Sequence, residues 1–259
     1  MKTLGLALGS GGGRGVAHIG FLQALEETGI TPSYISGCSM GSVVGAAYAA
    51  GMSPLAMRKA ACSLRFFDLV DITNRPGGFL DTRKMKKLLE RYLGDVEFSE
   101  LKIPFTCVAV DMIRQEIVEF SSGKVVDAVA SSSAIPSVFK PIEMDGMRLV
   151  DGGILRRVPV EEVRRMQPDV VVAVDVLGKR STKTGCPNVF GVMAEVIDVM
   201  DNFRTELYKE KMRKKYDLWL EPDLGDMSQY TFKNLEFAYR QGYEMGKNNI
   251  KKIRALLKD

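Results

Sequence analysis

The pentapeptide Gly-Cys-Ser-Met-Gly at 37–41 constrains the fold of this chain more than any other segment. It follows a strand-like run and precedes a helix-like run of small residues over 43–50. A Gly-x-Ser-x-Gly motif between a strand and a helix is typical of a nucleophile elbow, a sharp turn that presents a serine hydroxyl. Such a turn has no room for side chains two positions from the serine, so Gly37 and Gly41 are required sterically. The motif predicts an α/β fold with Ser39 at a helix N-terminus, where the helix dipole stabilises negative charge.

Short apolar runs alternate with helix-like segments over most of the chain. Strands are predicted at 4–8, at 34–35 before the motif, and at 105–112, 116–120, 147–150 and 170–176. Helices are predicted after residue 15, over 43–50, from residue 53, and over 83–93, 124–130 and 160–166, and the last third, about 189–259, is mainly helical. This alternation favours a central, mostly parallel sheet with helices on both faces, a three-layer α/β/α architecture. We predict a single domain over 1–259, because no linker, internal repeat or low-complexity segment interrupts the chain.

One apolar stripe in the last third recurs at helical spacing. Its members are Val189, Met193, Val196, Met200, Phe203 and Leu207. Such a stripe usually faces the core, and we expect it to do so here. The alternative is a dimer or membrane face, which is favoured by the basic residues Arg204, Lys209, Lys211, Arg213, Lys214 and Lys215.

Composition excludes several classes of protein. A formal net charge of +4 over 259 residues is too small to indicate nucleic-acid binding, although it suits contact with an anionic lipid surface. The four cysteines form no CxxC pair, there is one histidine, and no acidic cluster has calcium-loop spacing, so we expect neither a metal nor a cofactor. No apolar run reaches the ~18 residues of a membrane span, and the N-terminal run is too short for a signal peptide. We expect a cytoplasmic protein that transiently contacts the inner face of the membrane.

A glycine-rich loop, Gly-Ser-Gly-Gly-Gly-Arg-Gly, occupies 9–15 between the first strand and the first helix. It is not a dinucleotide fingerprint, because Arg14, Val16 or His18 falls where the third glycine belongs. It is not a P-loop either, because no Gly-Lys-Ser/Thr follows. A concave run of backbone N–H groups suits an oxyanion as well as a phosphate. A phosphate- or nucleotide-binding α/β module, in which Ser39 is only a turn residue, therefore stays open as an alternative.

The serine needs a base, and the chain offers few candidates. Its one histidine, His18, lies in an apolar helical turn, where a packed or hydrogen-bonded role is expected. Three aspartates end strand-like runs, namely Asp111, Asp151 and Asp175. Only Asp151 is followed by two glycines, which let the backbone bend so that the carboxylate faces a neighbouring loop. We therefore favour Asp151 as the base for Ser39.

Three motifs in this order resemble the patatin-like phospholipase family. They are the glycine loop with its basic residue, the Gly-x-Ser-x-Gly motif some twenty residues on, and the Asp-Gly-Gly at 151–153. The segments 14–20 and 133–136 add to the likeness, which runs from about residue 4 to about residue 176. Bacterial members and the catalytic domain of neuropathy target esterase are the nearest in pattern. Together the three motifs are highly specific, although each alone is not.

The resemblance implies a role for each motif. Ser39 is the nucleophile and Asp151 the base of a Ser-Asp dyad, which agrees with the shortage of histidine. The oxyanion hole consists of the backbone N–H groups of Gly11, Gly12, Gly13 and Met40, with Arg14, Gly37, Gly41, Gly152 and Gly153 as supporting motif residues. The family loop commonly reads Gly-Gly-Gly-x-Arg/Lys-Gly, whereas here Ser10 replaces the first glycine and Gly13 fills the variable position.

The sequence thus predicts a serine acyl hydrolase, of the lipolytic esterase, phospholipase A or lysophospholipase type, that acts on a lipid or acyl-ester substrate. An acyltransferase with the same dyad is the alternative within enzymes, because the sequence does not separate water from an alcohol as acceptor. For Arg14 we favour anchoring of the loop over contact with a lipid phosphate. The aromatic and apolar residues of 64–80 are candidates for an acyl-chain wall or an interfacial lid.

Overall fold

The structure of the chain is a computed structural model that describes residues 2–63, 81–136, 138–178 and 189–258. The strands are β1 Leu4–Leu8, β2 Tyr34–Cys38, β3 Phe105–Asp111, β4 Glu116–Phe120, β5 Ile142–Met144, β6 Met147–Asp151, β7 Val170–Val174 and β8 Leu218–Leu220. The helices are α1 Ala17–Glu26, α2 Met40–Ala49, α3 Pro54–Ser63, α5 Arg83–Leu93, α6 Val125–Ser132, α7 Val160–Arg165, α8 Val189–Lys211 and α9 Leu235–Lys258. The predicted strands and helices are confirmed in type, and β5 and β8 are additional. The proposed lid segment, 64–80, lies outside the described residues.

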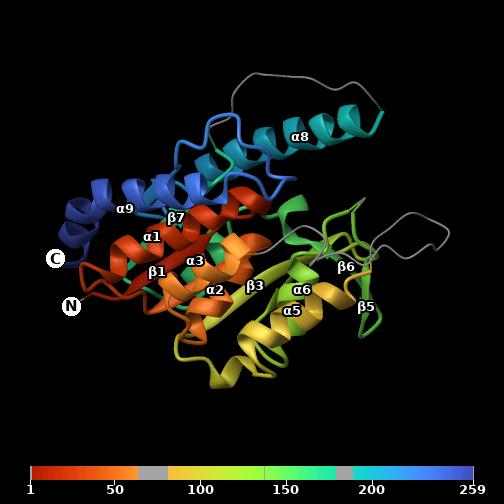
Figure 1. Cartoon of the computed structure of the whole chain (residues 1–259), viewed down its shortest axis with the longest axis horizontal. Coiled ribbons are helices and arrows are strands. Elements are labelled where there is room, and N and C mark those ends of the chain that lie inside the picture. Colours follow the sequence, from red (N-terminus) through yellow and green to blue (C-terminus); the bar gives the residue numbers. More distant parts are fainter. Residues whose placement is uncertain (1, 64–80, 137, 179–188, 259) are drawn as a thin grey trace.

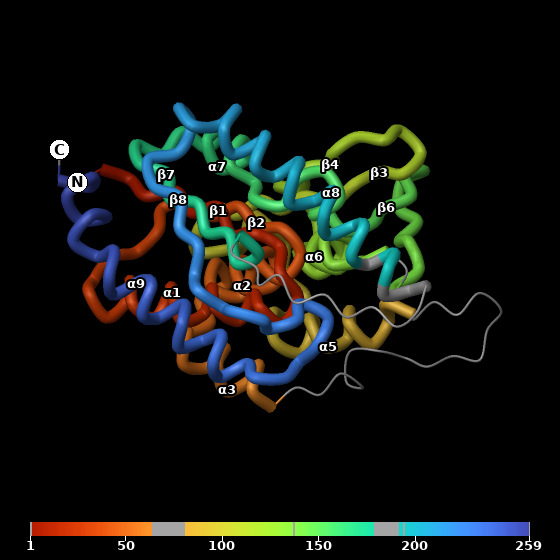
Figure 2. Tube along the Cα trace, turned by 90° about the horizontal axis from the view of Figure 1, so that it is seen from above, coloured from red at the N-terminus to blue at the C-terminus, as the bar shows by residue number. Residues whose placement is uncertain are grey.

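The strands form one sheet in the order β5-β6-β3-β2-β1-β7-β8, with β4 paired to β3 off this path. The pairings from β3 through β2, β1 and β7 to β8 are all parallel, whereas β4 and β6 run antiparallel to β3. Figure 2 shows α7 and α8 on one face of the sheet and α1, α2, α3, α5 and α9 on the other. The predicted three-layer α/β/α architecture with a mostly parallel sheet is therefore confirmed.

Alternation along the buried strands builds a separate core on each face of the sheet. Leu4, Leu6 and Leu8 of β1 belong to the larger core, which includes side chains of α1, α2 and α9. Ala7 of β1 belongs to the smaller core, which includes residues of α7. Because both faces are covered, the central strands β1, β3 and β7 are buried along their whole length and are mostly apolar, as expected of a parallel sheet.

Strand β3 aligns two other strands end to end. Its first half pairs in parallel with β2, up to Cys38 opposite Val108. Its second half pairs antiparallel with β6, from Asp151 opposite Ala109. Strand β4 pairs with the other edge of β3 from Cys107 to Asp111, a span that overlaps both stretches. Strands β2 and β6 therefore share one edge of β3 and run toward each other. The carboxyl end of β2, which leads into Ser39, therefore meets the carboxyl end of β6.

The apolar stripe of α8 does not face the core at five of its six predicted positions, so that prediction is wrong, and the side chain of Val189 lies outside the described part of the chain. Phe203 is 69% exposed and Met200 66% exposed, and Met193, Val196 and Leu207 are each more than half exposed. The helix instead buries residues on its opposite side, including Thr205. Helical spacing alone identifies an apolar face and does not reveal whether another element covers it.

The C-terminal helix α9 packs tightly along α1, and both helices lie side by side in Figure 1. Glycines allow this approach. A Cβ at Gly242 of α9 would lie 1.9 Å from the carbonyl oxygen of Ala17, and a Cβ at Gly20 of α1 would lie 2.0 Å from that of Tyr239. These are backbone atoms of a packed helix, so a side chain at either position forces the two helices apart.

We predict that Gly242→Ala destabilises the fold by about 1–3 kcal/mol, the usual range for overpacking. The change also improves the helix propensity of α9 by about 1 kcal/mol, which acts in the opposite direction. A net loss of stability therefore indicates that overpacking outweighs the gain in helix propensity. Urea denaturation followed by circular dichroism measures it. Asn248→Ala on the exposed side of the same helix is the matched control and is expected to shift the unfolding free energy by less than about 0.5 kcal/mol. A Gly242→Ala protein as stable as wild type would contradict the close approach.

Candidate active site

Ser39 lies on a strained turn between β2 and α2. Its φ of 51° and ψ of −123° place a non-glycine residue in a rarely populated region, which costs on the order of 1–3 kcal/mol. A Cβ at Gly37 would lie 2.5 Å from Cα of Ser42, and one at Gly41 would lie 2.2 Å from the carbonyl oxygen of Leu8. The predicted steric need for both glycines is confirmed. The turn presents Ser39 as the N-cap residue, immediately before the first residue of α2.

Asp151, at the end of β6, lies beside the Ser39 turn. Its carboxylate is buried, and an interaction with the Ser39 side chain stabilises its charged form. Oδ1 also accepts the backbone N–H of Gly153 at 2.8 Å and the thiol of Cys38, whose Sγ lies 3.9 Å away. A Cβ at Gly152 would lie 2.3 Å from the carbonyl oxygen of Val108, so the bend after Asp151 requires this glycine. The structure thus brings the two residues of the predicted dyad together.

Burial dominates the electrostatics of Asp151. Removal of the carboxylate from water raises its pKa from an ordinary 3.8 to about 6, and the negative charge of Asp201 adds to the rise. Hydrogen bonds from Ser39, Gly153 and Cys38 act in the opposite direction by stabilising the carboxylate. The group is therefore mostly ionised at neutral pH, while its proton affinity is well above that of an exposed aspartate.

The glycine loop lies over the N-terminus of α2 and against the segment that precedes α9. The N–H of Gly13 donates to the carbonyl of Gln229 at 3.0 Å, so this donor is engaged in the structure. Among the described residues, the N–H groups of Gly11, Gly12 and Met40 donate to no other group. Gly13 thus departs from the expected donor set, because the chain at 229 packs directly on the loop.

Two side chains hold the glycine loop in place. His18 is fully buried, and its Nε2 donates to the carbonyl of Gly9 at 2.8 Å. Burial lowers the pKa of this imidazole to about 4, so it is neutral at pH 7. Arg14 is also buried, and its guanidinium donates to the carbonyls of Val176 and Met227 at 2.8 and 3.1 Å. Both expectations are confirmed: His18 is a packed, hydrogen-bonded residue and Arg14 anchors the loop.

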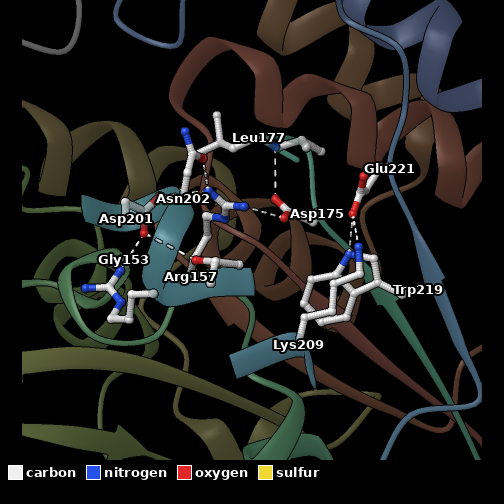
Figure 3. A network of polar contacts seen from close by, with 12 residues as sticks. Gly153, Arg157, Asp175, Leu177, Asp201, Asn202, Lys209, Trp219 and Glu221 are labelled. Atoms are coloured by element: carbon white, nitrogen blue, oxygen red, sulfur yellow. Dashed lines mark hydrogen bonds and ion pairs between the residues drawn. The ribbon is translucent and has the colours of Figure 1, made fainter. Parts of the chain in front are cut away.

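A buried ion-pair network links α8 to this region, as Figure 3 shows. Arg157 bonds Asp175 at the end of β7 at 2.7 Å and Asp201 of α8 at 2.9 Å. Arg204, on the next turn of α8, bonds Asp201 and donates to the carbonyl of Gly153 at 2.6 Å. Helix α8 is therefore fastened to the turn that carries Asp151.

Sequence reasoning did not identify several of these residues. Ser132 accepts the backbone N–H of Ser39 through its hydroxyl at 2.9 Å, and Arg157, Asp201 and Arg204 form the network described above. Ser132 stands in the serine-rich run at 131–133, which is a signal only once the elbow is known to lie beside it. The network residues carry no motif.

Ser39 opens onto an apolar cavity of about 300 Å³. The cavity extends between α2, α3 and α5, and its lining includes Val43, Ala47, Met57, Ala60, Met85, Leu89 and Phe139. Gly12, Ser39, Met40, Ser133 and Gln229 contribute the few polar groups near the serine. An apolar cavity that is lined by a serine at one place and by side chains of three helices elsewhere suits a hydrocarbon chain attached to a reacting group.

Within the ranges that the structure covers, no group of three or more His, Cys, Asp or Glu side chains is arranged to hold a metal ion. Among the described residues, no helix combines the length and the apolar character that are needed to cross a bilayer.

Known proteins are similar to this chain in the region that contains the three motifs. A family model described as patatin-like phospholipase matches residues 6–164. An uncharacterized NTE family protein of Mycobacterium tuberculosis is 38% identical over 188 residues, which cover 71% of this chain and 52% of that protein. Lysophospholipase nte1 of Emericella nidulans is 26% identical over 281 residues, which cover 98% of this chain and 18% of that protein. The chain spans about half the length of the mycobacterial relatives it matches.

The structure is also similar to a solved one. VipD from Legionella pneumophila superimposes with a TM-score of 0.64 at 15% identity, over 97% of this chain and 67% of that chain. At this identity the likeness concerns the fold alone.

We predict that Asp151→Asn becomes more stable relative to wild type as the pH rises. In wild type the raised pKa means that the folded state holds a proton more tightly than the unfolded state, and this stabilisation is lost between the ordinary value of 3.8 and about 6. Asparagine does not titrate. The difference in unfolding free energy should therefore change by about 2 kcal/mol in favour of the variant between pH 4 and pH 7, as measured by urea denaturation at successive pH values. A difference independent of pH would show that burial does not raise this pKa.

Proposed function

Because this chain belongs to the patatin-like phospholipase family, we propose that it is a serine acyl hydrolase of lipid esters with a Ser39–Asp151 dyad. One observation carries the proposal. The Ser39 residue, held on a strained turn at a helix N-terminus, lies where β2 and β6 meet, beside the buried carboxylate of Asp151, and opens onto an apolar cavity. These are the parts that acyl transfer requires: a nucleophile, a base and a site for the acyl chain.

In the first step, the Ser39 oxygen attacks the carbonyl carbon of the ester while Asp151 accepts the hydroxyl proton. A carboxylate with a pKa of about 6 is ionised at neutral pH and still takes up a proton more readily than an exposed aspartate. The C–O bond to the alcohol then breaks, and Asp151 returns the proton to the departing alkoxide. The acyl group remains as an ester on Ser39.

The negative charge that develops on the carbonyl oxygen needs donors that are already in position. We assign this role to the N–H groups of Gly11, Gly12 and Met40, which donate to no other group among the described residues. Gly12 and Met40 line the cavity together with Ser39, and Gly11 precedes Gly12 in the same loop. Gly13, whose N–H bonds Gln229, instead fixes the loop against the chain. Loss of one oxyanion donor typically lowers the rate by roughly 10²–10³.

In the second step, water replaces the alcohol. Asp151 removes a proton from the water as its oxygen attacks the acyl carbon, and the bond to Ser39 breaks with return of the proton to the serine oxygen. The products are a free fatty acid and the regenerated enzyme. The same acyl-enzyme could pass to an alcohol, so an acyltransferase differs only in the acceptor and stays the alternative.

The size of the cavity favours a substrate that places one acyl chain in the site. A volume of about 300 Å³ lies at the lower end of ligand pockets, which span about 300–1,000 Å³. We therefore favour a lysophospholipid or another monoacyl ester, reached by transient contact with a membrane surface. The apolar lining argues against a nucleotide-binding module, because a phosphate and a ribose need more polar partners than this cavity offers.

We predict that Ser39→Ala abolishes covalent labelling by a fluorophosphonate probe and lowers ester hydrolysis by at least about 10³-fold. Ser133→Ala is the matched control, because Ser133 lines the same cavity, and it should label as wild type does. Asp151→Asn should lose hydrolysis to a similar extent, whereas His18→Gln, which can still donate to Gly9, should remain active. Equal labelling of wild type and Ser39→Ala would refute the nucleophile. An active Asp151→Asn protein beside an inactive His18→Gln protein would refute the choice of base.

We also predict that Ala60→Phe shortens the acyl chain that the site accepts. Ala60 lines the cavity from α3, so a phenyl ring there occupies space that a long chain needs. Hydrolysis of a lauroyl ester should fall by at least about tenfold in kcat/KM, while that of a butyryl ester stays near the wild-type value. Ala56→Phe, on the same helix but not among the cavity residues, is the control. A parallel loss on both esters would mean that the cavity does not hold the chain.

A further inference from the structure

The outer face of α8 is an apolar surface that none of the other described elements covers. We define it as Val192, Val196, Val199, Met200, Phe203 and Leu207, each between 50% and 69% exposed. The six residues fall on one side of the helix and span more than four turns, as their spacing of three and four residues requires. Figure 1 shows α8 along an edge of the molecule, and Figure 2 shows it on the opposite side of the sheet from α1, α2, α3, α5 and α9. Contiguous apolar patches of this extent usually mark an interaction site.

The opposite side of α8 is joined to the active site. Asp201 and Arg204 hold the Arg157 network and the carbonyl of Gly153, next to Asp151. One turn earlier, Asp198 accepts hydrogen bonds from the side chains of Gln229 and Tyr230 at 2.8 and 3.1 Å, and both of those residues line the cavity. Helix α8 therefore contacts the catalytic turn and the cavity wall with its inner side, while its outer face points away from both.

Positive charge follows the apolar face along the chain. Between residues 206 and 215 there are five basic and two acidic residues. Lys211, Arg213, Lys214 and Lys215 are all exposed, beginning one turn after Leu207. Apolar side chains next to a cluster of lysines and arginines are typical of helices that lie in the interface of an anionic bilayer.

We propose that the outer face of α8 docks on an anionic lipid surface, with the basic cluster at 211–215 against the headgroups. The proposal rests on the proposed lipid hydrolase function and adds where the enzyme meets its substrate. A bilayer supplies an apolar layer for the face, anionic groups for the cluster, and the substrate itself. A second copy of this chain would supply only an apolar surface, because its own cluster carries the same charge.

The test is co-sedimentation with vesicles of equimolar phosphatidylcholine and phosphatidylglycerol. All proteins carry Ser39→Ala, so binding is measured without turnover and does not depend on whether Ser39 is the nucleophile. Met200→Gln/Phe203→Gln should lower the partition coefficient by at least about tenfold. Lys211→Gln/Lys214→Gln/Lys215→Gln should lower it by about 100-fold at low salt and have little effect on vesicles of phosphatidylcholine alone.

Met112→Gln/Ile113→Gln is the matched control, because it removes a methionine and a second exposed apolar residue from the β3–β4 turn. It should bind vesicles as the parent does. Hydrolysis of a soluble butyryl ester by the Ser39-containing forms should be the same for all variants, which verifies their folding. Equal vesicle binding by the α8 variant and the control would overturn the proposal, as would absence of binding by the parent. Dissociation of a dimer by Met200→Gln/Phe203→Gln with unchanged vesicle binding would assign the face to a second copy instead.

Discussion

The end-to-end meeting of β2 and β6 along one edge of β3 is the constraint on which the site depends. Cys38 and Asp151 pair with successive residues of β3, Val108 and Ala109, so the distance between their strands' ends is set by the sheet itself. A loop-borne base would lose this precision, since loops vary more than paired strands. The nucleophile elbow then needs only the two close glycines to point the serine back toward the carboxylate.

The same arrangement concentrates unfavourable energy in one place. Ser39 holds a positive φ, and Asp151 carries a charge in a buried position where its pKa rises to about 6. Neither would persist in an isolated turn. Two independent supports surround them: the pairing of both β2 and β6 with β3 fixes the two chain ends, and the Arg157 network fastens α8 over the turn after Asp151. The free energy lost at Ser39 and Asp151 is offset by burial of the sheet and by the ion pairs of Arg157 with Asp175 and Asp201.

Sequence patterns predicted the parts of this site that depend on local rules. Gly37, Gly41 and Gly152 reveal backbone contacts because only glycine fits there, and the shortage of histidine directs attention to an aspartate. The pairing of Ser132 with the Ser39 N–H and the engagement of Gly13 by Gln229 depend on segments far apart in the chain. No local pattern encodes such a contact, because it follows from how the sheet and the C-terminal segment pack. The short strands β5 and β8 were missed for a different reason, because three residues carry too little periodicity to be recognised as a strand.

Helix α8 shows why an amphipathic stripe can be assigned to the wrong side. Most surface helices bury their apolar face, but the region beneath α8 is a charged network around Arg157, which selects polar residues such as Asp201 and Thr205 for the inner side. The apolar residues are then left outside, where they serve no packing role within the described chain. Their retention over more than four turns, at 50–69% exposure, is costly for a protein surrounded by water on that side. A lipid surface removes this cost, and it does so at the helix that is bonded both to the cavity wall and to the turn that carries Asp151.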